Sequence, residues 1–253
     1  MSDATPRPSD YTYQFKSSNT STDWQIEDCQ IKADIVYLHP EIANAYYEYS
    51  KNGSLPIKYT TYNTLNQSIT GAGTSLSINV ARTCTRLVNV FASFYNNTSP
   101  RYWLKPFNSF LHPMIKSTVV DGTGLFPAYD YNYDIEWQIQ IGSKFYPSYP
   151  VRSTAEAFSH LLKTLNYPNK YQHSSIINPV SWRSTKFMIA YDFERMRDAA
   201  FTGINTFSGD LMIIRVKPLV STSDANFFGD NMFIILVSDN ILNISDVGTE
   251  VQG

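Results

Sequence analysis

Two carboxylates in this sequence have a spacing that suits acid–base chemistry. Asp134 and Glu136 lie in an alternating run, and residues i and i+2 of a strand point to the same face. Two carboxyl groups several ångströms apart on one face are what glycoside hydrolysis requires. Asp34 and Glu41 form a second, less regular pair. Polar strand faces carry such pairs routinely, so the spacing favours an ordinary solvated face and leaves a glycosidase as an alternative.

The other residues that could do chemistry do not form a recognisable site. The four histidines, His39, His112, His160 and His173, do not lie at metal-ligand spacing from one another or from a cysteine, and neither HExxH nor CxxC occurs. Asp121-Gly-Thr-Gly is similar to an aspartic protease turn, but its inserted glycine breaks that pattern. We therefore expect no enzyme activity, no metal and no cofactor.

The carboxylates belong to a stretch whose hydrophobic period changes from that of a strand to that of a helix. Apolar residues alternate with polar ones over 133–141, which predicts a strand with one dry face. A Pro-rich corner follows Gly142. Ser153 and Glu156 then form a capping box, and an apolar stripe over 158–165 predicts a helix.

A second strand-then-helix unit precedes this one. Its alternating run predicts a strand over 24–38, and Pro40 is suited to the first turn of a helix. Several short strands with few helices favour a mainly β fold, namely a jelly-roll sandwich or barrel with short helices inserted in the inter-strand connections. We predict a flexible N-terminal arm at 1–22, a first β unit at 23–95 (a partial or complete jelly roll), an irregular connection at 96–127 and a second β unit, a jelly roll, at 128–253.

Composition narrows the function classes. Net charge is −2, and no basic run of five or more occurs, so no dedicated nucleic-acid surface is visible. The longest apolar run is too short to span a bilayer, and the N-terminus lacks the apolar core of a secretory signal. The two cysteines, Cys29 and Cys84, are expected to be free and buried. Only 17% of residues are charged whereas 15% are aromatic, which suits a chain that buries its sides against partners.

Tyrosines and arginines near the two helices, together with two arginines of a later charged cluster, are candidates for contacts between subunits, because interfaces favour these residue types. Ordinary core and rim positions, or a sugar-binding aromatic platform, remain alternatives for the aromatic residues. A dense mixed-charge cluster at 192–198 suits a salt-bridged turn or a subunit contact. The candidates are Tyr46, Tyr49, Tyr146, Tyr149, Arg152, Arg195 and Arg197.

Several stretches together resemble a known family. They are Ala33-Asp-Ile-Val-Tyr-Leu-His-Pro-Glu followed by Tyr46-Tyr-Glu-Tyr, then Ile139-Gln-Ile-Gly-Ser-Lys-Phe-Tyr-Pro, Phe187-Met-Ile-Ala-Tyr-Asp and Gly203-Ile-Asn-Thr-Phe-Ser-Gly-Asp-Leu. They are similar to the double-jelly-roll major capsid proteins of DNA viruses, including polinton-like, virophage-like and nucleocytoplasmic large DNA virus relatives. The match is mainly to the C-terminal part of such proteins, and it leaves open a segment, a compact variant or a single jelly roll.

The resemblance implies a structural protein of the virion, made in the host cell without a secretory signal. It implies self-association into trimers that tile an icosahedral shell, with minor capsid or penton proteins as further partners and with no cofactor. Two alternatives from other classes remain open. One is a carbohydrate-binding β-sandwich or receptor-binding module, and the other is a jelly-roll glycosidase.

Overall fold

The computed structural model describes residues 25, 27–69, 75–95, 134–166, 177–179, 182, 186–194, 203–207, 210–219 and 228–252. The predicted N-terminal arm at 1–22 and the whole of the predicted connection at 96–127 lie outside these residues. Within them, strands predominate and two helices occur. The elements are α1 (Pro40–Asn52), β1 (Leu55–Ser68), β2 (Leu76–Val80), β3 (Leu87–Tyr95), β4 (Ile135–Ile141), β5 (Lys144–Val151), α2 (Thr154–Thr164), β6 (Ile189–Asp192), β7 (Met212–Pro218), β8 (Asn231–Ser245) and β9 (Gly248–Gln252).

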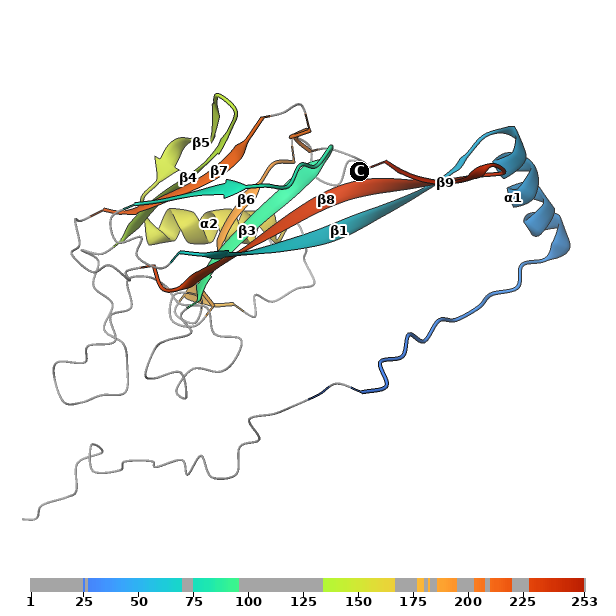
Figure 1. Ribbon diagram of the computed structural model, residues 1–253, viewed down its shortest axis with the longest axis horizontal. Coiled ribbons are helices and arrows are strands. Elements are labelled where there is room, and N and C mark those ends of the chain that lie inside the picture. The colour runs from blue at the N-terminus through green and yellow to red at the C-terminus, as the bar shows by residue number, and fades with distance from the viewer. Residues whose placement is uncertain are drawn as a thin grey trace, which may run out of the picture.

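The strands form two antiparallel sheets that pack as a sandwich (Figure 1). One sheet has the order β1-β8-β3-β6, with β9 paired to the outer part of β8, and the other has the order β2-β7-β4-β5. Apart from β9, the described strands number eight and divide into two rows of four, which is the arrangement of a jelly roll. The predicted fold class, a jelly-roll sandwich with short inserted helices, is therefore confirmed.

Each sheet takes strands from both of the β units predicted at 23–95 and 128–253. The first strand, β1, pairs with β8 along its whole length, and β2 pairs with β7. The two ranges therefore contribute strands to the same two sheets. The sequence did not reveal this because hydrophobic alternation identifies a strand without identifying its partner.

The core lies between the sheets and follows the alternation of β4. Ile135, Trp137, Ile139 and Ile141 are buried, while the residues between them are partly exposed. Other large buried side chains meet β4 from elsewhere in the chain, with Phe94 stacked on Phe187 and on Phe228. The core joins both sheets, and it includes Trp182, Met212, Ile214, Met232, Ile234 and Leu236.

The helix α2 begins where the capping box predicts. The Ser153 hydroxyl accepts a hydrogen bond from the Glu156 backbone N–H at 3.1 Å, which satisfies one of the unpaired donors of the first turn. Ala157 and Leu161 are buried. The Phe158 ring packs on the Trp182 ring, with the ring centroids 5.1 Å apart. The helix lies beside β6. The predicted apolar stripe thus closes one side of the sandwich.

Three predictions from the linear pattern were wrong. Residues 27–38 form no strand, and their side chains are exposed, since no strand of the described structure lies beside them to supply hydrogen bonds. Cys29 is accordingly exposed rather than buried, whereas Cys84 is buried as predicted, and both are free. The Pro-rich corner after Gly142 is instead strand β5, which lies at the edge of its sheet among the described strands. Proline is tolerated there because none of the described strands pairs with the outer side of β5.

Candidate functional site

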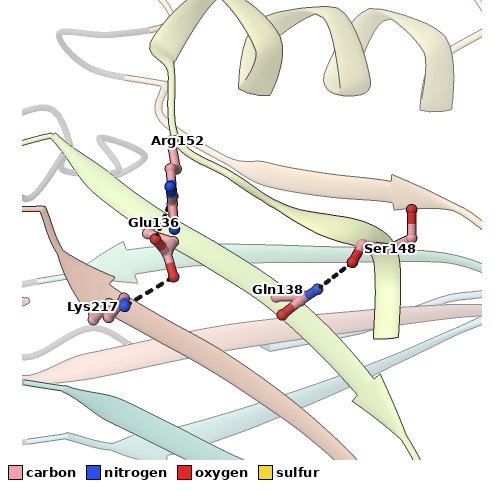
Figure 2. A network of polar contacts seen from close by, with 5 residues as sticks. All are labelled: Glu136, Gln138, Ser148, Arg152 and Lys217. Atoms are coloured by element: carbon pink, nitrogen blue, oxygen red, sulfur yellow. Dashed lines mark hydrogen bonds and ion pairs between the residues drawn. The ribbon is translucent and has the colours of Figure 1, made fainter. Parts of the chain in front are cut away.

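The two carboxylates singled out by their spacing have structural partners. Glu136 on β4 forms ion pairs with two basic side chains (Figure 2). Its Oε2 is 2.7 Å from Arg152 Nε, and its Oε1 is 3.0 Å from Lys217 Nζ. Arg152 follows β5, and Lys217 lies on β7, so one carboxylate links three neighbouring strands. Only 12% of the Glu136 side chain is exposed. Next along β4, the Gln138 side-chain amide donates hydrogen bonds to the carbonyls of Pro147 and Ser148 on β5.

The pKa shifts of the two carboxyl groups have different causes. Burial would raise the pKa of Glu136, but hydrogen bonds from Lys217 and Arg152, together with their charges, outweigh it and lower the pKa. Burial raises the pKa of Asp134, although its oxygens accept hydrogen bonds from the Ile135 N–H and the Thr154 hydroxyl. Asp134 thereby ties β4 to the first residue of α2. Both carboxyl groups position strands and a helix, which does not favour the glycosidase reading.

Replacing Glu136 by glutamine is expected to lower the free energy of unfolding by about 1 kcal/mol at pH 7, because both cations reach solvent and keep part of their hydration. A lowered carboxyl pKa adds stability above the pKa of the unfolded chain, and this stability is lost as the pH falls through the folded pKa. The gap between wild type and Glu136→Gln should therefore close in acid. Urea titrations at pH 7 and at pH 3 measure it. The exposed Glu250→Gln is the control, and an equal gap at both pH values would contradict the prediction.

His160 on α2 lies in an aromatic environment between the helix and the sheets. Its ring centroid is 5.9 Å from that of Trp137 and 5.6 Å from that of Tyr191. Burial lowers the pKa of His160, the charge of Glu156 opposes this shift and the charge of Lys163 adds to it. The imidazole therefore packs as a neutral ring. No group of three or more metal-ligating side chains gathers anywhere in the described residues.

The lowered pKa of His160 predicts a loss of stability in weak acid. Below about pH 6.5 the unfolded chain binds a proton at this histidine more readily than the folded chain does, so the free energy of unfolding falls as the pH falls. His160→Phe should flatten this dependence between pH 7.5 and pH 5.5. The measurement is the urea midpoint at both pH values. His39→Phe, at an exposed histidine, is the control, and a wild-type slope in His160→Phe would contradict the assignment.

The predicted contact residues fall on separate surfaces. Tyr46 and Tyr49 are exposed on α1, and Tyr149 is 82% exposed on β5. Helix α1 and strand β5 lie at opposite ends of the molecule (Figure 1). Tyr146 differs from the other tyrosines because its ring packs within the chain, 5.2 Å from Phe193 and 6.1 Å from Tyr191. Arg152 is paired with Glu136, while Arg195 and Arg197 lie outside the described residues.

The structure adds a surface that the sequence did not indicate. Strands β1 and β8 continue beyond the sandwich towards α1, and β9 pairs with this outer part of β8 (Figure 1). We call α1, residues 55–60 and 239–245, and β9 the extension. Directly opposite residues of paired strands share a face. Ile57 is opposite Leu242, and Leu242 is opposite Val251, so an apolar row crosses all three strands. Strand register, which creates this row, was not predictable from the sequence.

The fold is similar to that of solved viral proteins. The crystal structure of PBCV-1 VP54, fitted into a cryo-EM reconstruction of the virophage Sputnik, matches 86% of this chain and 55% of its own length, with a TM-score of 0.50 and 12% sequence identity. This chain has a jelly-roll fold similar to that of this viral protein. It spans about half the length of the VP54 chain.

Other comparisons are weaker. The Faustovirus major capsid protein matches 83% of this chain and 36% of its own length, with a TM-score of 0.48 and 10% identity. The quasi-atomic model of the PBCV-1 virus capsid matches 79% of this chain and 52% of its own chain, with a TM-score of 0.39 and 14% identity. No protein-family model and no curated protein sequence matches the chain. None of the helices in the described ranges is long and apolar enough to cross a membrane.

Proposed function

We propose that this protein is a structural subunit of a viral capsid. The observation that carries the proposal is the likeness of its jelly-roll fold to PBCV-1 VP54 over 86% of the chain. Because folds host many functions, the described residues must also be compatible with such a role. They are, since the carboxylates that best suited catalysis hold strands together and the exposed side chains include many large apolar ones.

The finer part of the proposal concerns assembly. Copies of the chain associate into trimers, the trimers tile a shell in the virion, and minor capsid or penton proteins complete it. Tyr46, Tyr49 and Tyr149 are the proposed subunit contacts, because each is exposed and aromatic. Tyr146 and Arg152 act indirectly, by holding β5 and the start of α2 in place.

Purified chain examined by size-exclusion chromatography with light scattering over a range of concentrations tests the proposal. The expected result is a mass three times that of the chain, or larger, with regular particles in negative-stain micrographs. A chain that stays monomeric at the highest concentration reached contradicts the proposal. Tyr149→Ser should reduce assembly and leave the thermal midpoint unchanged, since the side chain is almost fully exposed.

A carbohydrate-binding module is the second candidate, because jelly rolls also occur in lectin domains. It predicts a monomer or small oligomer whose thermal midpoint rises with a glycan, as mass action requires. A thermal-shift screen against a glycan panel, run beside the light-scattering measurement, separates the two functions. A glycan-dependent rise together with a concentration-independent monomer would favour the module over the capsid subunit.

A further inference from the structure

The segment that precedes α1 has the pattern of a strand but pairs with none of the strands that the structure describes. Ile31, Ala33, Ile35 and Tyr37 alternate with mainly polar residues, which is typical of a strand with one buried face. In the structure, residues 27–38 are exposed throughout, and the exposed fraction of Ile31 is 97%. From here on, the arm means residues 27–38 and not the N-terminal arm predicted at 1–22. Apolar side chains exposed to this degree in a continuous segment mark a surface that a partner covers.

Strand β1 likewise presents an edge to which none of the other described strands is paired. β1 forms one edge of its sheet, and it pairs with β8 on one side over 14 residues. None of the described strands pairs with its other side. Long edge strands present a row of unsatisfied backbone donors and acceptors, and an extended segment from another chain is the partner that fits them.

We propose that the arm of one copy adds as a strand to the β1 edge of a second copy. This inference rests on the proposed function, since it requires copies of the chain to meet. The partner is a second copy because every chain carries both the extended segment and the edge, and their lengths are similar. In its own chain the arm leaves α1 and runs clear of the sheet (Figure 1). Exchange between two copies can then be reciprocal and closed, or continue around a ring.

The sequence of the two segments favours one antiparallel register. With Ile35 opposite Ile57, the apolar row of the extension lengthens to Ile35, Ile57, Leu242 and Val251 across four strands. The same register sets Tyr37 opposite Leu55 on that face. On the other face it sets Asp34 opposite Lys58, and opposite charges in directly paired positions stabilise a sheet.

Disulfide trapping between two full-length chains tests the exchange. Both chains carry Cys29→Ser, and the remaining Cys84 is buried. One tagged chain carries Ile35→Cys and an untagged chain carries Ile57→Cys. Directly opposite residues have the Cα separation that a disulfide needs. The expected result is a disulfide-linked dimer of one tagged and one untagged chain on a non-reducing gel. The control pair, Val36→Cys with Ile57→Cys, should give little of this dimer because the two side chains would face opposite sides of the sheet.

A matched pair of substitutions gives a second readout. Ile35 and Val36 are both 77% exposed, so neither Ile35→Lys nor Val36→Lys should change the stability of the isolated chain. Ile35→Lys places a charge in the apolar row and should weaken association roughly tenfold, whereas Val36→Lys should have a much smaller effect. Light scattering over a dilution series measures both variants.

The outcomes separate this inference from the proposed function. Oligomers that form without the 35–57 cross-link, and that respond equally to both lysine substitutions, overturn arm exchange and leave the capsid role intact. A cross-link confined to a single chain carrying both cysteines likewise overturns exchange between copies. A chain that never associates overturns the capsid role itself.

Discussion

Replacing Trp137 by alanine is expected to lower the free energy of unfolding by about 3–5 kcal/mol. Trp137 is only 1% exposed at the middle of β4, and its neighbours come from both sheets and from His160 on α2. Truncation removes a large buried apolar surface and leaves a cavity that the surrounding strands cannot fill. Because small domains are stable by about 5–15 kcal/mol, a large share of the stability would be lost.

Urea unfolding followed by circular dichroism measures this effect. Trp137→Phe keeps much of the ring volume, so it should cost clearly less than alanine. Tyr62→Ala, on the exposed face of β1, is the matched control and should change stability by no more than about 0.5 kcal/mol. A Trp137→Ala variant as stable as Tyr62→Ala would mean that β4 does not lie at the centre of the core.

Substituting alanine for Gly142 should cost about 2 kcal/mol. Gly142 opens the two-residue turn between β4 and β5 with a φ of +58°, where L side chains are strained. An added Cβ would also lie 2.7 Å from an Asp210 carboxylate oxygen, so that side chain would have to move. The measurement is again the urea midpoint.

Two controls separate the backbone part from the steric part of the stability lost in Gly142→Ala. Gly53→Ala should be nearly neutral, because Gly53 has an extended φ of −167° and a Cβ there would meet only the Tyr49 carbonyl at 3.7 Å. Combining Gly142→Ala with Asp210→Ala removes the steric part and leaves the backbone part. If Gly142→Ala proved no more costly than Gly53→Ala, the positive φ at this turn would be refuted.

The elements that local sequence predicts well are those whose buried face is complete within one segment. The alternation of β4 and the capping box of α2 are of this kind, and both are confirmed. The segment at 27–38 has an equally regular alternation, yet it forms no strand because pairing depends on a neighbour that the pattern does not specify. Local pattern therefore predicts the capacity to form a strand, and long-range pairing decides whether one forms.

The candidate site was less predictable than the fold. Tyr149 is exposed whereas Tyr146 packs on Phe193, and the spacing of the two tyrosines within one Pro-rich run did not predict this difference. The ion pairs of Glu136 could be predicted only by knowing that β7 and the end of β5 flank β4. The apolar row of the extension depends on the register of β1, β8 and β9, and hydrophobic periodicity carries no information about register across strands that are distant in sequence.

The pairing of β1 with β8 has a consequence for how the protein is made. Leu55 is opposite Ile244, and β2 pairs in the same way with the distant β7. Neither sheet can therefore form completely until the ribosome has released strands that come late in the sequence. Contacts so distant along the chain slow folding, because the connecting loops must be ordered first. A nascent chain that ends before β8 exposes the edges of β1 and β3 together, which makes it prone to aggregate. The release of β8, rather than the appearance of the first strands, therefore controls when the sandwich can form.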